Sequence, residues 1–578
     1  VYKAIITIVK QYLILMIRTF MTPRSEGEHG LSDRVLIIDG YTDEPSMFGV
    51  PPYISPYVRY IYGAVLDAGG EVRYKTIDEF RGLDVELRKK LLSWADIIVI
   101  HRAVIVPGKY LGGTPIKFRE VMWISENARG KVILGGSVAS YGFGGIGGHK
   151  PISIETLRDY VDYLVPEDVD AFVYDLIVHK KASLRHRTQN EWKRWAVLGA
   201  RLVRDHNWYP YIICEIETYQ GCHRFITGGC SFCMEPLRAY RVRDEEDIVA
   251  EAEALYKNGV RYIRIGGQPC FYSYKAIGFG YEEIPRPNVN AIRRLLVGIN
   301  NVGEFRVIHI DNGNPSVIAN WPDEAKEVTK LLVSYASDGN VVALGMESAD
   351  PRVIKENNLN ATPEEVIKAV EIINSVGAVR GPSGMPWILP GINILFGLRG
   401  ERKETYRINY EFLKEILDRG LLLRRINIRE VVPIRGKFPR VDVRLVHHWK
   451  EKIRRDIDLP MLRRVVPKGT ILKNVFMEIH EGNYTKGRQL GTYPLLVVVP
   501  YSVELRRFYD VKIIDHGYRS VTGLIYPIDI NKASLKELMS VPGISKKLAG
   551  KLLAKRPLSV EELKNMLPRK SWEYFKIN

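Results

Sequence analysis

Three of the five cysteines in the 578-residue chain lie within one glycine-rich loop. Cys222, Cys230 and Cys233 have the spacing C-x7-C-x2-C, with no obvious fourth ligand nearby in the sequence. Three thiolates suit an iron–sulfur cluster with one open iron better than a structural zinc ion, which takes four protein ligands. The apolar run 210–216 before the loop predicts a buried strand, and the periodic run 244–256 after it predicts a helix.

The opening Gly221-Cys222, the ending Cys230-Ser-Phe-Cys233 and the strand in front resemble the cluster loop of radical S-adenosylmethionine (SAM) enzymes. In that superfamily three cysteines bind a [4Fe–4S] cluster, and the amino and carboxylate groups of SAM occupy the fourth iron. The resemblance implies that the three cysteines are cluster ligands and that Phe232 covers the cluster and faces the adenine; packing of the loop is its alternative role. Seven residues, rather than the commoner three, separate the first two cysteines, which puts the subgroup in doubt. A zinc loop that borrows His223 is the other interpretation.

The segment 33–185 alternates short apolar runs with helical patterns, which predicts an open parallel sheet. Strands are expected at 34–39, 71–76, 96–101 and 131–135, and helices at 56–68 and 85–94. This segment resembles the flavodoxin-like, B12-binding-like domain that precedes the SAM barrel in several radical SAM groups. It lacks a D-x-H-x-x-G motif, so cobalamin without a histidine ligand remains only an alternative cofactor. No cysteine precedes Cys214, which excludes an auxiliary sulfur-donating cluster in this domain.

Two loops of this segment, 40–49 and 141–148, contain glycines that let backbone amides approach a phosphate or a flat ring. A surface loop is the plainer interpretation of both. Residues 1–32 are expected to be an N-terminal extension or an alternative start. Their apolar run 4–20 is broken by Lys10, Gln11 and Arg18, which argues against a transmembrane helix and leaves a membrane-surface helix as the alternative.

The segment 205–440 is similar to the partial (β/α)6 barrel of the same superfamily. Five further apolar runs predict the remaining strands, at 261–265, 305–310, 341–345, 391–396 and 425–433. Thr362 is expected to cap the helix that Pro363 opens. Two polar turns resemble SAM-binding turns of the superfamily. The first contains Gly266, Gly267 and Gln268, with glutamine in place of the usual glutamate, and the second contains Glu347 and Ser348.

Cys270 follows the first of these turns and is a candidate hydrogen-atom donor or adduct-forming residue. Because a free cysteine is more often a small buried hydrophobe, that role competes with a structural one. Cys214 and His309 are expected in the core. His447 and His448 have no metal-ligand spacing and are expected on the surface.

The segment 441–527 predicts a linker helix and a small β domain, in the position that the TRAM domain occupies in tRNA methylthiotransferases. The segment 528–578 resembles a helix-hairpin-helix, with Ser534 as a helix cap. Gly543, Ser545, Lys546 and Lys547 surround the start of the second helix, where backbone amides and the helix dipole favour a phosphate. From residue 528 onward the sequence has eleven Lys or Arg against five Asp or Glu, which fits sequence-independent phosphate contact.

The whole arrangement is similar to an archaeal family of radical SAM proteins with a C-terminal helix-hairpin-helix. The net charge of +17 and pI of 9.4 favour a polyanionic partner, although thermophilic proteins are also basic without one. Few cysteines indicate a reducing, cytoplasmic compartment. We therefore expect a radical SAM enzyme that modifies tRNA or rRNA with electrons from ferredoxin or flavodoxin. The alternatives are small-molecule, lipid or cofactor biosynthesis with a protein-binding tail, and nucleic-acid binding with a structural or redox-sensing cluster.

Overall fold

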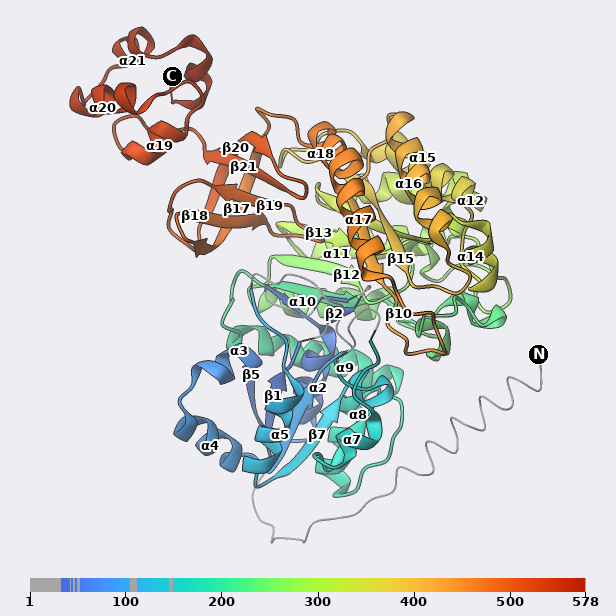
Figure 1. Ribbon diagram of the computed structural model, residues 1–578. Coiled ribbons are helices and arrows are strands. Elements are labelled where there is room, and N and C mark those ends of the chain that lie inside the picture. The colour runs from blue at the N-terminus through green and yellow to red at the C-terminus, as the bar shows by residue number, and fades with distance from the viewer. Residues whose placement is uncertain are drawn as a thin grey trace. The chain divides into compact units, whose positions relative to one another are not determined.

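The computed structural model describes residues 33–41, 43–44, 47–48, 52–103, 112–144 and 149–576 (Figure 1). The chain forms two compact units, each described by itself below. The N-terminal unit contains Val1–Glu215 and Asp247–Val260, and the C-terminal unit contains Ile216–Glu246 and Arg261–Asn578. The expected extension 1–32 and parts of the loops 40–49 and 141–148 lie outside the described residues. Within the described ranges, no helix combines the length and apolar character needed to cross a lipid bilayer.

The N-terminal unit is built on a five-stranded sheet in the order β5-β1-β6-β7-β8, in which neighbouring strands are parallel. Its strands are β5 (Glu71–Thr76), β1 (Arg34–Asp39), β6 (Ile97–His101), β7 (Lys131–Gly135) and β8 (Tyr163–Val165). All five residues of β6 are buried, as expected for a strand covered on both faces. The four predicted strands are confirmed, and β8 is a fifth that the sequence analysis missed.

Helices pack on this sheet, and two of them were predicted. These are α2 (Pro56–Asp67) and α4 (Val85–Trp94); the others are α3 (Ile77–Gly82), α5 (Phe118–Asn127), α6 (Val138–Tyr141), α7 (Ile154–Arg158), α8 (Val169–His179) and α9 (Gln189–Gly199). Helices α2 and α9 touch through their backbones. A Cβ atom added to Gly63 would lie 2.1 Å from the carbonyl oxygen of Trp195, and one added to Gly199 would lie 1.8 Å from that of Arg59. Only glycine allows such a close crossing.

A buried ion pair joins α2 to α10 (Glu245–Lys257) inside the N-terminal unit. Arg59 Nη1 lies 2.6 Å from Glu251 Oε1, and neither side chain is exposed to solvent. Arg59 also donates to the main-chain oxygen of Glu215. A buried charge is tolerated only when it is paired and hydrogen-bonded, so this pair fixes how α10 packs in the unit.

The C-terminal unit begins with two parallel sheets whose strands follow the order of the chain. The first contains β12 (Tyr262–Gly266) and β13 (Val307–Ile310); β9 (Ile213–Glu217) precedes them in the chain, and its last two residues belong to this unit. The second contains β14 (Asn340–Glu347), β15 (Ile388–Phe396) and β16 (Arg425–Glu430), and a bridge between Gly313 and Leu344 links the two sheets. All six predicted strands form, but β16 ends at Glu430 rather than at residue 433. The pairing stops there because Glu430 is matched with Phe396, the last residue of β15.

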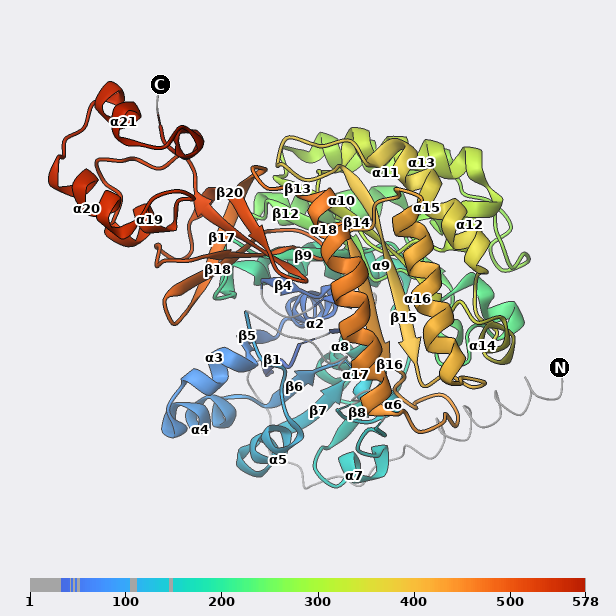
Figure 2. The same cartoon turned by 45° about the horizontal axis from the view of Figure 1, so that its top comes forward.

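Helices connect the six strands. The longest are α11 (Val289–Val302), α13 (Pro322–Tyr335), α15 (Pro363–Gly377) and α16 (Lys403–Asp418), with the shorter α12 (Pro315–Asn320) and α14 (Pro351–Glu356) between them. Figure 2 shows α15 and α16 beside β15. Thr362 caps α15 as predicted, because its hydroxyl accepts from the Glu365 amide and the Glu365 carboxylate accepts from the Thr362 amide.

A small closed β-barrel follows, after α17 (Val443–Ile453) and α18 (Leu459–Val465). Its strand order is β17-β18-β19-β21-β20, formed by β17 (Ile471–Glu481), β18 (Tyr484–Gln489), β19 (Leu496–Val499), β20 (Phe508–His516) and β21 (Ser520–Ile525). The loop between β18 and β19 docks on the larger sheets: the Thr492 amide donates to His309 Nδ1 over 2.8 Å, and Arg424 donates to the Tyr493 carbonyl. His309 is therefore buried, as predicted.

The chain closes with short helices, α19 (Leu535–Ser540), α20 (Lys546–Ala554), α21 (Val560–Met566) and η6 (Arg569–Tyr574). Lys512 of β20 ties this tail to the small barrel, since its ammonium lies 2.7 Å from the Glu573 carboxylate. His447 and His448 are exposed on α17, as expected.

Replacing Glu251 with Leu should lower the free energy of unfolding of the N-terminal unit by about 3–5 kcal/mol, because Arg59 would stay buried without its carboxylate. The double variant R59M/E251L should recover most of that loss. Urea unfolding followed by circular dichroism measures both, with the units analysed as separate transitions. The exposed pair Lys89–Glu86 supplies the control, since E86Q should change stability by less than about 1 kcal/mol. Equal effects of E251L and E86Q would contradict the argument.

Candidate functional site

The cysteine loop is closed at its base by a small antiparallel ladder. Strand β10 (Tyr219–Gln220) pairs with β11 (Arg241–Val242), so the residues between them form one loop. A short helix, η2 (His223–Thr227), follows Cys222, and Gly228 and Gly229 then adopt φ of +80° and +63°. These left-handed conformations favour glycine, and they turn the chain from Cys222 towards Cys230 and Cys233.

The three loop thiols lie close enough to influence one another electrostatically. Burial raises the pKa of Cys222 to about 12 and that of Cys230 to about 11, and it raises the pKa of Cys233 well above its ordinary value. Negative charge on Cys230 and on Cys222 also raises the pKa of Cys233. Three thiolates at this position therefore require a positively charged partner, which a bound iron cluster supplies.

Thiolates are the usual ligands of iron–sulfur clusters, so the residue types of the cysteine loop suit such a cluster. Across the described ranges, no group of three or more His, Cys, Asp or Glu side chains is arranged so that it could hold a metal ion. His223, the residue that a zinc loop would borrow, is engaged elsewhere. Its Nδ1 lies 2.7 Å from the Glu283 carbonyl oxygen, and its Nε2 lies 2.9 Å from Asn314 Nδ2. The structure thus gives no support to His223 as a fourth ligand.

Arg224 is a buried cation beside the loop that the sequence analysis did not single out. Its Nη1 donates to Cys230 Sγ over 3.2 Å and to the Asn358 carbonyl over 2.8 Å, while Nε and Nη2 donate to Glu283 Oε1. The charge of Arg224 lowers the pKa of Cys230 against the effect of burial. Arg224 therefore favours the thiolate that iron needs and anchors the loop to two other segments.

Polar side chains from later in the chain hold the loop from outside. Ser231 Oγ donates to Asn357 Oδ1 over 2.8 Å, and Asn358 Nδ2 donates to the Gly229 carbonyl over 3.0 Å. Arg435 Nη1 donates to the carbonyl oxygens of Cys230 and Cys233 over 3.2 and 3.1 Å. Each of these contacts joins residues more than a hundred positions apart in the sequence, so no local motif could predict them.

The predicted turn Gly266, Gly267 and Gln268 closes the end of β12. Gly267 has φ of +78°, and Gln268 is fully buried. The Gln268 amide donates to the Ile265 carbonyl over 3.1 Å, and its oxygen accepts from Thr218 Oγ1 over 3.1 Å. Gln268 therefore braces the turn, and the backbone groups of Gly266 and Gly267 are the part of it suited to a ligand.

The second predicted turn lies at the end of β14. Glu347 adopts φ of +53°, and burial raises its pKa to about 8, while Arg224 acts in the opposite direction. Charge on Glu347 raises the pKa of Cys230, which places this carboxyl near the cysteine loop. Ser348 is buried, and its Oγ accepts from the Asp350 amide over 3.3 Å.

Phe232 and Cys270 have packing roles in the structure. Phe232 and Cys230 pack against a buried apolar cluster formed by Val353, Leu359, Leu398 and Val431. Cys270 is 1% exposed, its Sγ accepts from the Asn314 amide over 3.1 Å, and burial raises its pKa. Cys214 is buried in β9, as predicted.

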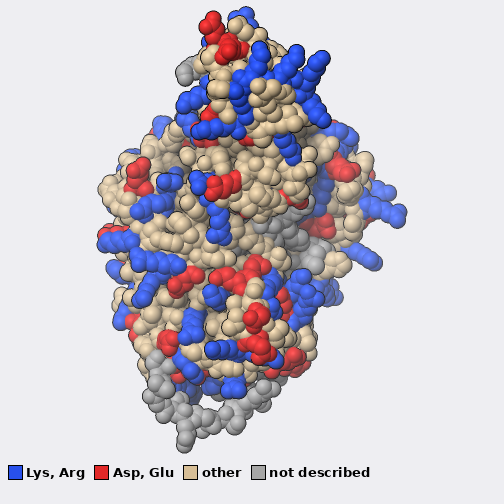
Figure 3. Space-filling model, turned by 90° about the vertical axis from the view of Figure 1, so that its left-hand side faces the viewer, with Lys and Arg blue, Asp and Glu red and all other residues tan. Residues whose placement is uncertain are grey.

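The C-terminal helices form a compact turn around Gly543. Ser534 caps α19 in a reciprocal bond with Glu537, and the Ile544 amide donates to the Val541 carbonyl. Gly543 has φ of +93°, and an added Cβ would lie 2.7 Å from Lys570 Cε. The hydroxyl of Ser545 accepts from the Leu548 amide and caps α20. Lys546 and Lys547 are exposed beside this helix start, and Figure 3 shows Lys and Arg gathered over the tail at the top of the view.

The carboxyl ends of the strands in the N-terminal unit carry a second group of polar residues. Asp39, at the end of β1, is buried and accepts from the Tyr74 hydroxyl and the Tyr41 amide, each over 2.9 Å. Burial raises the pKa of Asp39 to about 7. His101, at the end of β6, is also buried, and burial lowers its pKa to about 4. Ligands of open parallel sheets bind at this edge.

Residues 216–413 match the radical SAM superfamily. Together with the cysteine loop, this match defines the class: the chain is a radical SAM enzyme that uses a [4Fe–4S] cluster and SAM. The uncharacterized protein MJ0274 of Methanocaldococcus jannaschii is 49% identical over 509 residues, which cover 85% of this chain and 93% of that protein. An uncharacterized protein of Archaeoglobus fulgidus is 39% identical over 557 residues, 94% and 99% of the two chains. The chain belongs to the same archaeal family as these two proteins.

More distant similarity extends to other members of the superfamily. The ribosomal protein uS12 methylthiotransferase RimO of Thermoanaerobacter sp. is 26% identical over 218 residues, 37% of this chain and 42% of RimO. Among solved structures, the radical SAM methyltransferase TsrM from Kitasatospora setae has a TM-score of 0.45 at 16% identity. That alignment covers 69% of this chain and 73% of TsrM.

Replacing Arg224 with Met should lower the iron bound per chain after anaerobic reconstitution, because Cys230 loses a donor and the loop loses its bonds to Asn358 and Glu283. R224K should retain more iron, since an ammonium still donates to the sulfur. Iron analysis and the visible absorbance of thiolate-bound iron report both, with C230A as the fully disrupted reference. Wild-type iron content in R224M would show that Arg224 is dispensable for cluster binding.

The pH dependence of stability should reveal the neutral carboxyl of Asp39. The folded pKa of about 7 lies above the ordinary value of 3.8, so between these pH values the unfolded chain releases a proton that the folded chain retains. Stability of the N-terminal unit should therefore fall as pH rises through this window, by about 1.4 kcal/mol per pH unit. Urea unfolding at pH 5 and 7 measures the slope. D39N should flatten it, and the exposed-site variant D159N should not.

Proposed function

We propose that this radical SAM enzyme modifies RNA and that its C-terminal helices bind the RNA backbone. The observation that carries the proposal is the capped start of α20, where Gly543 shapes the turn and the exposed Lys546 and Lys547 flank it. Such a helix start combines free backbone amides, a favourable dipole and positive side chains. This combination suits phosphate contact without base recognition, as a helix-hairpin-helix provides.

Other residues of the C-terminal unit have separate roles in the proposed reaction. Cys222, Cys230 and Cys233 would hold the cluster, while Gly266, Gly267, Glu347 and Ser348 lie at the strand ends where SAM would bind. When bound, cluster and SAM supply a 5′-deoxyadenosyl radical that takes a hydrogen atom from carbon. Arg224 keeps the loop in place and favours the Cys230 thiolate. A cytoplasmic ferredoxin or flavodoxin would supply the electron.

The cysteine inventory limits the reaction. Outside the loop the sequence contains Cys214 and Cys270, and both are buried in separate parts of the chain. Neither can contribute to an auxiliary cluster with further thiolates, which argues against sulfur insertion. Methylation, rearrangement or carbon–carbon bond formation fits better. Cobalamin remains an alternative second cofactor for methylation, at the strand ends that carry Asp39 and His101.

Two other functions compete with RNA modification. One is small-molecule, lipid or cofactor biosynthesis, in which the tail binds a protein. The other is modification of a protein, suggested by the similarity to RimO, a methylthiotransferase of ribosomal protein uS12. Formation of 5′-deoxyadenosine by the reconstituted enzyme, with and without RNA, tests the leading proposal. Mass spectrometry of nucleosides from cells with and without the gene then identifies the modification. Identical nucleoside profiles would overturn RNA as the substrate.

Replacing both Lys546 and Lys547 with Ala should weaken RNA binding. The slope of log affinity against log salt concentration should become shallower by about one for each lost phosphate contact. The matched control is K551A/K555A, which removes the same charge from the opposite, carboxyl-terminal end of α20. Filter binding at several salt concentrations measures both variants. Equal losses in the two variants would indicate diffuse electrostatic attraction rather than a site at the helix start.

A further inference from the structure

The two faces of the sheet β14-β15-β16 carry different side chains. Phe396 of β15 stacks on Tyr406 of α16, with ring centroids 4.5 Å apart, so the even-numbered residues of β15 face the helices. Side chains alternate along a strand, so Gly391, Asn393 and Leu395 face the opposite side. We call this opposite side the interior face of the barrel.

The register between β15 and β16 shows which residues of β16 lie on the interior face. Gly391 pairs with Arg425, Asn393 with Asn427, and Leu395 with Arg429. Side chains of paired residues in parallel strands point the same way, and Asn427 Nδ2 donates to Asn393 Oδ1 over 3.1 Å in agreement with this. One edge of the interior face is therefore a row of Arg425, Asn427 and Arg429.

Small residues lie beside this row. On β14 the residues paired with Gly391 and Asn393 are Ala343 and Gly345. Glycine and alanine at three of these positions project little or no side chain over the interior face. The Glu347 carboxyl lies over Gly345, because a Cβ atom added there would be 2.6 Å from Glu347 Oε1, so this face carries an acidic side chain beside the amides of Asn393 and Asn427.

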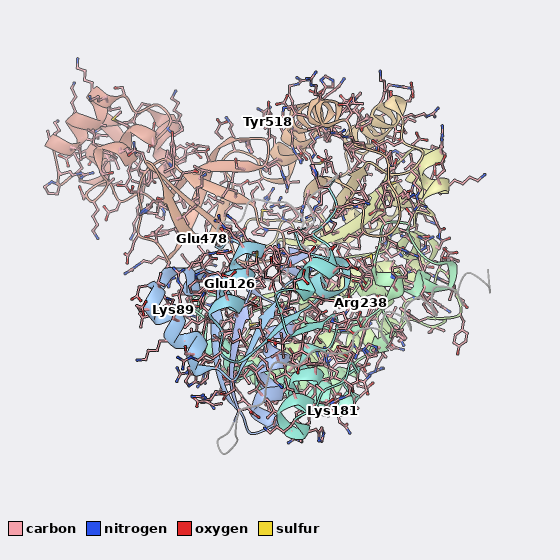
Figure 4. The ribbon with its side chains drawn as sticks, turned by 60° about the horizontal axis from the view of Figure 1, so that its bottom comes forward. Lys89, Glu126, Lys181, Arg238, Glu478 and Tyr518 are labelled. Carbon is pink, nitrogen blue, oxygen red and sulfur yellow. The ribbon has the colours of Figure 1, made fainter. Side chains whose placement is uncertain are left out.

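Several arginines lie close together near this row, and burial raises the pKa of the Glu347 carboxyl on the same face to about 8. Burial and the positive charge of the neighbouring Arg425 lower the pKa of Arg424 to about 10. The pKa of Arg519 also falls to about 10. Burial is the main cause, followed by the positive charges of Arg454, Arg425 and Arg429. Arg519 lies in the hairpin between β20 and β21, next to Tyr518, which Figure 4 labels.

Asp458 opposes these effects on both Arg424 and Arg519, but it already pairs with Arg454. Arg429 itself has an unsatisfied donor. Its Nη1 is buried and has no hydrogen-bond partner in the part of the chain that the structure describes. A buried charged donor without an acceptor costs free energy, which an anionic ligand would recover.

We propose that Arg429, with Asn427 and Asn393, forms a phosphate-binding site on the interior face of the barrel and positions the substrate there. Arg425, packed 4.1 Å over the Tyr493 ring, lies at the other end of the row and contributes positive potential. Guanidinium groups bind phosphate through paired hydrogen bonds, and the amides of Asn427 and Asn393 add neutral donors. This inference rests on the proposed function in assigning the phosphate to the substrate. The same chemistry is found in an RNA phosphodiester and in a phosphorylated small molecule.

The test uses the full-length reconstituted protein and inorganic phosphate as the probe, measured by calorimetry. R429Q should weaken phosphate binding about tenfold or more, as expected for a lost charge-assisted hydrogen bond. R429K should lie between R429Q and wild type, and N427D should also weaken binding by placing a carboxylate in the row. The control R407Q removes an exposed arginine of α16 and should leave binding unchanged. Circular dichroism verifies that each variant is folded.

Two competition arms, run in the full-length K546A/K547A variant, separate the sources of phosphate. Displacement of phosphate by a short RNA oligonucleotide would assign the site to RNA. Displacement by a nucleoside monophosphate alone would keep the site but overturn RNA as the substrate. The site itself is overturned if wild type does not bind phosphate, if R429Q and R407Q behave alike, or if R429Q loses SAM binding while phosphate binding is unchanged.

Discussion

The structure depends on keeping three thiols close together in a partly buried loop. Burial and mutual repulsion both oppose their ionisation, as the raised pKa values of Cys222, Cys230 and Cys233 show. An iron–sulfur cluster held by these cysteines, as we propose, would supply compensating positive charge, and a loop that is already held in place would favour its binding. Arg224 meets both needs, because it carries a buried positive charge and donates to Cys230 Sγ as well as to Asn358.

The parallel order of the strands brings the other groups to the same place. Strands β12 and β14 end in the turns that contain Gln268 and Glu347, and parallel strands present their carboxyl ends at one edge. The Asn357–Asn358 segment and Arg435 reach back to the cysteine loop from this edge. The catalytic chemistry, the brace of the loop and the proposed phosphate site on β16 are therefore consequences of one topology.

Much of the fold followed from local sequence signals. Short apolar runs predicted β1, β5, β7 and all six strands of the larger sheets, because burial requires such runs whatever the partner. Capping residues marked helix starts at Thr362 and Ser534, where a hydroxyl meets the amide three residues on. The length of β16 was overestimated, because the apolar run continued past the last residue that the ladder could pair.

Helix α9 was not predicted, although Thr188 and Glu191 form a capping box at its start. What no local signal could predict is its close crossing with α2, where Gly63 meets Trp195 and Gly199 meets Arg59. The two glycines are more than a hundred residues apart, and neither glycine alone predicts a helix crossing. Arg429 is similar, since its unsatisfied donor and its small neighbours appear only when β14, β15 and β16 are aligned.

The sequence alone determined the spacing of the cysteines, the alternation of strands and helices and the caps, because each of these is set within a few residues of chain. Only the tertiary structure decided that Arg224 and Arg435 hold the cysteine loop, that Cys270 is buried and that arginines line the interior face. Those relations depend on strand order and register, which bring distant residues together through contacts that no local periodicity encodes.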